Sequence, residues 1–174
     1  MLMKSTRILI TLFIICFSTQ LATANVTSSV NQFKTVGTAE MRWLMFPLYQ
    51  IALKTPNGKY QQNSYPKVLD ITYRRSIEKR HLISATDQQW QRLGLPQSQR
   101  QQWTQQLNNI WPSVKPGDQL AFQVNADGKN TFIYNGRNIG GVADQQFGES
   151  FLSIWLSPNT SQPGIRQRLI SPGS

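Results

Sequence analysis

The stretch KPGDQLAFQVNADGKNTFIYNGRNIGGV, residues 115–142, consists of short apolar segments separated by turn residues. Two of the separators, Asp127-Gly128 and Asn135-Gly136, supply the positive φ angles that tight β-hairpins require. They divide the stretch into three short strands. The stretch therefore predicts an antiparallel meander with two hairpin turns.

Two segments nearer the N-terminus also have strand patterns. In KVLDITY, residues 67–73, successive residues fall on opposite faces, one of them apolar and the other mixed. This alternation indicates a half-buried strand. The segment from Val30 to Leu53 is strand-like as well, and Gly37 is its expected bend or hairpin point.

The remaining segments have apolar residues at helical spacing. A first amphipathic helix is indicated between residue 73 and Gly94, a second one before Pro112, and a third one that begins at Asp144. Residues 163–170 are predicted as a short closing helix. This order predicts an α+β domain in which helices are layered on one face of an antiparallel sheet. The other face must then be covered by something else or be used.

The N-terminal residues have the pattern of an export signal. Two basic residues precede the mostly apolar run from Ile8 to Phe17, and Ala22-Thr23-Ala24 matches the small-x-small cleavage pattern. The run is too short to span a bilayer, which needs about 20 apolar residues. A signal peptide at 1–24 is therefore predicted, followed by a single periplasmic or secreted domain at 25–174.

Composition argues against several kinds of chemistry. The only cysteine, Cys16, lies within the predicted signal peptide, and His81 is the only histidine. The exported domain would therefore have no disulfide, no thiol nucleophile and no thiolate metal site. The carboxylates are scattered without metal-ligand spacing, and there is no Gly-rich phosphate loop. Neither a cofactor nor a metal ion is expected.

The predicted mature chain is strongly basic. Without Lys4 and Arg7, the 18 basic side chains fall to 16 against 8 acidic ones, a formal charge of +8. This charge favours acidic partners such as lipid head groups or small carboxylates, and the export signal argues against nucleic acid. The densest basic cluster lies between residues 74 and 81. It is either the solvated start of a helix or a peripheral membrane contact, and its cations are Arg74, Arg75, Lys79 and Arg80.

RWLMFPLYQIAL, residues 42–53, is apolar almost throughout but begins with Arg42 and contains Tyr49. A guanidinium keeps its proton, so Arg42 either stays in solvent or meets an anion. Along a straight strand the two residues would be roughly 23 Å apart and on opposite faces. A bulge at Pro47 would change the face and turn both side chains toward one cleft.

The same stretch resembles the strand signature of the bacterial chalcone isomerase-like proteins, in which an Arg-Trp-Leu start leads to a Val-Tyr-x-Ala ending. Residues 132–170, FIYNGRNIGGVADQQFGESFLSIWLSPNTSQPGIRQRLI, resemble the C-terminal block of that family. WPSVKPGDQL, residues 111–120, is similar to its Pro-Gly-Asp entry to the meander. The resemblance covers nearly all of the predicted mature chain. It implies the chalcone isomerase fold, an antiparallel sheet with helices packed against one face.

The resemblance also implies two functions and a set of site residues. Plant isomerases of this fold close a flavanone ring with the help of Arg, Tyr and hydroxyl side chains, whereas non-catalytic relatives use Arg and Tyr to hold a fatty-acid carboxylate. Arg42 matches the family's strand arginine, and Tyr49 matches the tyrosine of the bacterial members. Trp155 stands close to the place where the plant isomerases have Ser or Thr. The missing hydroxyl argues against the isomerase.

Three functions remain open at this point. The favoured one is an exported, non-catalytic binder of a fatty acid or a similar small amphipathic carboxylate, held by Arg42 and Tyr49 with Trp155 among the aromatic walls. The alternative is a cofactor-independent intramolecular lyase or isomerase that acts on a chalcone-like or other enone substrate, where Arg42 stabilises developing negative charge. In the third, the open sheet face docks a protein or the membrane, with the basic segment 74–81 as the contact. The five tryptophans either fill the core or line a pocket.

Overall fold

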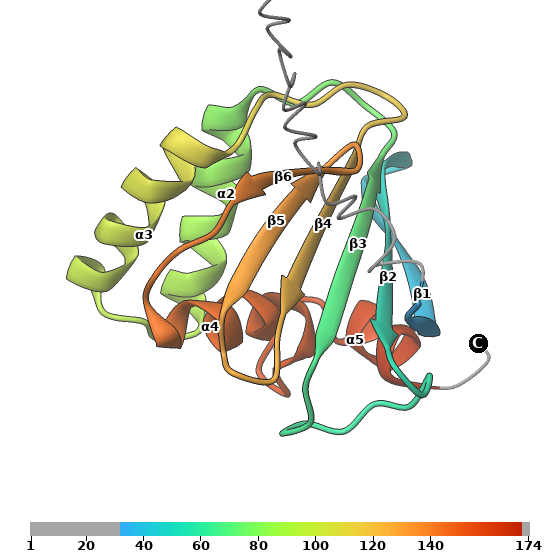
Figure 1. The fold of residues 1–174 in the computed structure, drawn as a ribbon. Coiled ribbons are helices and arrows are strands. Elements are labelled where there is room, and N and C mark those ends of the chain that lie inside the picture. Colours follow the sequence, from blue (N-terminus) through green and yellow to red (C-terminus); the bar gives the residue numbers. More distant parts are fainter. Residues whose placement is uncertain (1–31, 172–174) are drawn as a thin grey trace, which may run out of the picture.

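The structure, a computed structural model, describes residues 32–171. The predicted signal peptide at 1–24, its cleavage site and the polar segment at 25–29 lie outside the described residues. Residues 32–171 form one six-stranded sheet and four helices (Figure 1).

All six strands are antiparallel, and their order in the sheet is their order in the sequence. The predicted strand at 67–73 and the predicted three-stranded meander are both confirmed. At the second turn of the meander, Asn135 has a φ of 47° and Gly136 a φ of 79°, as such hairpins require. The strands are β1 (Lys34–Trp43), β2 (Phe46–Thr55), β3 (Lys67–Tyr73), β4 (Gln119–Val124), β5 (Asn130–Tyr134) and β6 (Arg137–Gly140).

Four helices cover one face of the sheet, and the α+β architecture expected from the sequence is confirmed (Figure 1). α5 packs against β1 and β2, α4 packs beside α5, and α2 contacts both α3 and α4. Asp144 begins α4 as expected, because its carboxylate accepts the backbone N–H of Gln146 at 2.9 Å. The helices are α2 (Lys79–Arg92), α3 (Gln97–Ile110), α4 (Gln145–Leu156) and α5 (Pro163–Ile170).

The core between the sheet and the helices consists largely of aromatic rings in edge-on contact. The indoles of Trp90 and Trp103 lie 5.2 Å apart, and both meet the ring of Phe147 edge-on. Their N–H groups donate to the carbonyl of Ser150 and to Asp144, each at 2.9 Å. Four of the five tryptophans are buried in this cluster or beside it, so they fill the core.

The first hairpin differs from the prediction. Its turn consists of Leu44 and Met45, whereas Gly37, the expected hairpin point, lies inside β1. Glycine is needed at that position because a Cβ would collide with backbone carbonyls of α5. The stretch 42–53 is therefore not one strand but the end of β1, a turn and most of β2. The turn escaped detection because it contains none of the residues that mark turns.

The opposite face of the sheet has no helix on it among residues 32–171. Val68, Ala121 and Ile133 form a small apolar cluster there, against which Phe33 packs. Beyond this cluster the face carries the ion pair between Lys54 and Asp70, whose charged atoms lie 2.6 Å apart. Both side chains of this pair are about one-fifth exposed.

Candidate functional site

Two of the three predicted site residues meet on the helix side of the sheet. The indole N–H of Trp155 in α4 donates to the hydroxyl of Tyr49 in β2 at 3.1 Å, across 106 positions of sequence. Tyr73 contacts the Tyr49 ring edge-on, with ring centres 6.0 Å apart. Burial raises the pKa of Tyr49 to about 12, although the hydrogen bond from Trp155 partly opposes this shift. The pair is a core hydrogen bond between largely buried side chains.

Arg42 does not join this pair. Met41 is paired with Tyr49 across the hairpin and Arg42 with Pro47, and the register shifts between them, which leaves Leu48 as the bulged residue. The guanidinium of Arg42 lies 2.5 Å from the carboxylate of Glu40, two residues earlier on the same strand, and its side chain is 59% exposed. Alternate strand residues share a face, so Arg42 lies on the face opposite Tyr49. The single cleft expected for both residues is not formed, and the role of Arg42 in binding stays a prediction.

The basic cluster at 74–81 is spread over the end of β3 and the start of α2. Arg74 donates to the side chain of Gln50 at 3.1 Å, and the Lys79 ammonium donates to the Asn108 carbonyl at 2.9 Å. Arg80 is paired with Glu78 at 2.8 Å. The guanidinium of Arg75 lies over the ring of Phe46.

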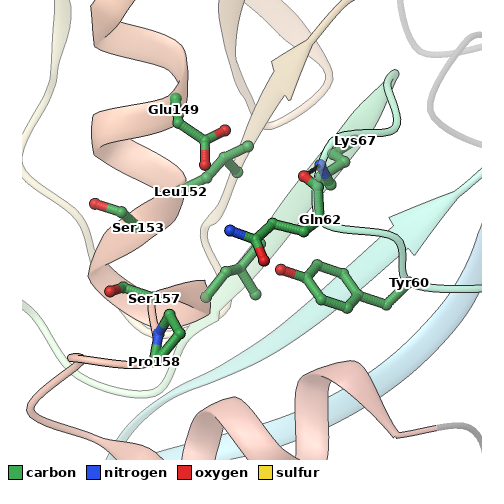
Figure 2. A pocket seen from close by; sticks show the side chains of 9 residues that line it. Tyr60, Gln62, Lys67, Glu149, Leu152, Ser153, Ser157 and Pro158 are labelled. Atoms are coloured by element: carbon green, nitrogen blue, oxygen red, sulfur yellow. Dashed lines mark hydrogen bonds between the residues drawn. The ribbon is translucent and has the colours of Figure 1, made fainter.

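A different group of side chains lines a partly open cavity of about 100 Å³ at the other end of β3 (Figure 2). Lys67, the first residue of β3, is only 1% exposed, and its ammonium donates to the carbonyl of Gln62 at 2.6 Å. The ammonium also lies over two aromatic rings, 3.9 Å from the centre of Tyr65 and 5.9 Å from that of Tyr60. The cavity is lined by Tyr60, Gln62, Lys67, Glu149, Leu152, Ser153, Leu156, Ser157 and Pro158.

Strand and helix periodicity bring these side chains together. Lys67 has the same parity in β3 as Leu69 and Ile71, so it points toward the helices. On α4, residues 149, 152, 153 and 156 recur at spacings of three and four, which places them on one helix face. The loop between β2 and β3 closes the cavity from the third side with Tyr60 and Gln62 (Figure 2).

The charges at the cavity are close but not paired with each other. None of the ion pairs within residues 32–171 involves Lys67. Glu149 instead accepts a hydrogen bond from the hydroxyl of Tyr65. Burial lowers the pKa of Lys67, an effect that the negative charge of Glu149 opposes. Burial and the hydrogen bond to Glu149 raise the pKa of Tyr65, so this tyrosine stays protonated at neutral pH.

This arrangement can bind an anion. A lysine ammonium has three N–H donors, and Lys67 uses one of them on a backbone carbonyl. A carboxylate that enters the cavity would pair with a cation already removed from water, which makes the pairing stronger than at a surface. Metal binding has no comparable support, because the described part of the chain contains no group of three His, Cys, Asp or Glu side chains.

A larger but shallow depression lies beside β1. Its volume is about 530 Å³, and Glu40, Gln50, Arg74 and Arg168 are among its lining residues. Two arginines line this depression, but Glu40 lines it as well and would repel a bound carboxylate. Glu40 already pairs with Arg42. The cavity at Lys67 has a mixed polar and apolar lining that includes Glu149, but Glu149 accepts from Tyr65 and forms no ion pair with the Lys67 ammonium. It is therefore the better candidate for a carboxylate.

Sequence reasoning missed Lys67, although one signal was present. The alternation in KVLDITY puts residue 67 on the apolar face of the strand, where a lysine is unusual unless its charge has a partner. The contributions of Tyr65 and Glu149 could not be read in this way, since these residues are 84 positions apart and meet only in the folded domain.

Comparisons with known proteins agree with this fold. The sequence model of the chalcone isomerase-like family matches residues 19–171, and the chain belongs to that family. The chain is 27% identical over 135 residues to an uncharacterized protein of Haemophilus influenzae, a match that covers 78% of this chain and 66% of that protein's length, slightly less than two thirds. The crystal structure of a fatty-acid binding protein of Arabidopsis thaliana superposes with a TM-score of 0.65 at 10% identity. That match covers 80% of this chain and 87% of the other and shows a shared fold.

Proposed function

We propose that the protein is an exported, non-catalytic binder of a fatty acid or a similar small amphipathic carboxylate, and that Lys67 receives the carboxylate. The observation that carries this proposal is a buried ammonium that faces a cavity and forms no ion pair with a carboxylate within the described residues. The fold is shared with a protein described as fatty-acid binding, which is consistent with the proposal. Export rests on the signal pattern at 1–24.

The size of the cavity restricts the mode of binding. Its volume of about 100 Å³ is well below the roughly 300–1,000 Å³ of pockets that enclose a whole small molecule. The carboxyl group and the first carbons of a chain fit inside it. The remaining carbons would follow the rim, where Tyr60 is partly exposed and Pro158 is exposed. Affinity should therefore rise with the first carbons of a linear acid and then level off.

The isomerase alternative has less support. It needs Tyr49 to donate to a substrate, but the hydroxyl of Tyr49 lies against the indole of Trp155 and its ring packs against the core. Tyr49 does not line the cavity at Lys67. Turnover of chalcones or related enones by the purified protein would favour the isomerase over the proposed binder.

The proposal is tested by native mass spectrometry of the protein purified without detergent. We expect an adduct of the mass of a small organic acid, retained by wild type and lost in Lys67→Met. Lys54→Met is the matched control, because it removes the same charge from the neighbouring strand on the opposite sheet face, where Lys54 is paired with Asp70. An adduct kept by Lys67→Met, or wild type that stays free of adduct when fatty acids are added, contradicts the proposal.

A further inference from the structure

The tip of the β1–β2 hairpin exposes four consecutive large apolar side chains. The exposed fractions are 66% for Trp43, 79% for Leu44, 83% for Met45 and 50% for Phe46. Trp43 is paired with Phe46, and the two residues between them form the turn. Contiguous exposed apolar side chains of this kind mark contact sites on soluble domains.

The conformation of the turn does not explain why these residues are apolar. Leu44 has a φ of 56°, in the left-handed region where glycine and asparagine cost least. The turn at Asn135-Gly136 of the same sheet has the sequence that a tight hairpin favours. Leucine at position 44 is thus unfavourable for the turn itself, and Met45 beside it is not buried in the domain, which is consistent with a role in contact outside it.

Arginines lie beside this apolar tip. The guanidinium of Arg75 lies over the ring of Phe46, 4.6 Å from its centre. Arg74 is fixed beside the hairpin because its backbone N–H donates to the carbonyl of Leu48 at 2.8 Å. Both arginine side chains are exposed. Arg42 adds a third guanidinium, although Glu40 neutralises it.

We propose that the β1–β2 hairpin tip inserts into the head-group region of a bilayer that contains anionic phospholipids, with Arg74 and Arg75 at the lipid phosphates. A protruding apolar tip with flanking cations complements a surface on which negative phosphates lie above hydrocarbon. Tryptophan at the base of the tip is suited to that interface, since its ring is apolar and its N–H is polar. Arginine stems can cover apolar surface while their charged heads reach the phosphates.

This inference does not rest on the proposed function. The tip adjoins the end of β3 at Tyr73, and Lys67 is at the beginning of that strand, roughly 20 Å away along its length. Loss of carboxylate binding in Lys67→Met would leave the hairpin unchanged. The two proposals can therefore fail separately.

Trp43 is a reporter for the test, since the other four tryptophans are at most 7% exposed. Vesicles of phosphatidylglycerol mixed with phosphatidylethanolamine are added to the purified protein. We expect a blue shift of tryptophan emission, protection of Trp43 from acrylamide, and quenching by brominated lipid chains. Vesicles of phosphatidylcholine alone should bind the protein more weakly, because they carry no net charge to attract the arginines.

Three variants make the test specific. Leu44→Asn/Met45→Gly installs a favourable turn without apolar side chains, so the domain should fold while vesicle partitioning falls by about tenfold or more. Arg75→Gln should lower partitioning to anionic vesicles by about fivefold. Lys129→Gln is the matched charge control at the β4–β5 turn, at the opposite end of the sheet, and should have no effect.

Unchanged partitioning of the Asn-Gly variant overturns the proposal. So does a Trp43 that remains equally accessible to acrylamide with and without anionic vesicles. That second result would favour a protein, and not a membrane, as the partner that contacts the hairpin tip.

Discussion

The ammonium of Lys67 lies 3.9 Å from the centre of the Tyr65 ring, and the hydroxyl of that ring donates to Glu149. The tyrosine thus contacts both charges, and lysine and glutamate do not form an ion pair. Had they paired directly, the cation would be neutralised from within the protein. The arrangement instead keeps a buried positive charge beside a cavity, and this is the basis of the proposed carboxylate site.

Carboxylate binding should weaken at alkaline pH. Only the protonated form of Lys67 attracts a carboxylate, and burial lowers its pKa below the ordinary value of 10.5. Affinity is therefore constant around neutrality and declines as pH rises through the lowered pKa. The decline should begin at a lower pH than the titration of a surface lysine. Calorimetric titration with octanoate between neutral and alkaline pH measures it. The Lys54→Met variant should have the wild-type profile, and an affinity that does not change before surface lysines titrate would contradict the assignment.

Tyr49→Phe should destabilise the domain without changing carboxylate affinity. The substitution leaves the buried indole N–H of Trp155 without its acceptor, which costs about 1–3 kcal/mol in the free energy of unfolding. Urea unfolding measures this loss. A double-mutant cycle with Trp155→Phe isolates the energy of the pair. A large loss of octanoate affinity at unchanged stability would instead restore Tyr49 to the binding site.

Asp144→Ala should remove two hydrogen bonds at once. The carboxylate of Asp144 caps α4 through the N–H of Gln146 and accepts the N–H of the fully buried Trp103. Loss of the cap costs about 1 kcal/mol, and an unpaired buried N–H costs about 1–3 kcal/mol, so a destabilisation of about 2–4 kcal/mol is expected. Asp144→Asn keeps one accepting oxygen and should lose less. Equal unfolding free energies for Asp144→Ala and wild type would show that neither bond stabilises the domain.

The elements that could be predicted are those with local signals. Asn135-Gly136 identifies a turn, and the alternation in residues 67–73 identifies β3, because backbone preference and side-chain parity are properties of the segment itself. The Leu44-Met45 turn has no such signal. Gly37 resembled a turn residue but serves the packing of α5, which depends on a helix more than a hundred positions later.

The site was harder to predict for the same reason. Arg42 and Tyr49 stood out because they are polar residues in an apolar stretch. The hairpin between them, however, places their side chains on opposite faces of the sheet. Tyr49 and Trp155 do meet, as a core pair. The enclosure around Lys67 depends on the β2–β3 loop and α4 closing over it, and no local pattern encodes that contact.

The most direct test of the account is calorimetric titration of octanoate into wild type, Lys67→Met, Lys54→Met and Arg42→Ala at neutral pH. A charged hydrogen bond in a buried site is worth about 1.5–3 kcal/mol, so Lys67→Met should bind about tenfold to a hundredfold more weakly. Circular dichroism should show that this variant is folded, because exchanging a buried lysine for an apolar residue of similar shape is tolerated. The account predicts wild-type affinity for Lys54→Met and for Arg42→Ala. Undiminished binding by Lys67→Met would contradict the account. Loss of binding in Arg42→Ala alone would also contradict it and would place the carboxylate on the other face of the sheet.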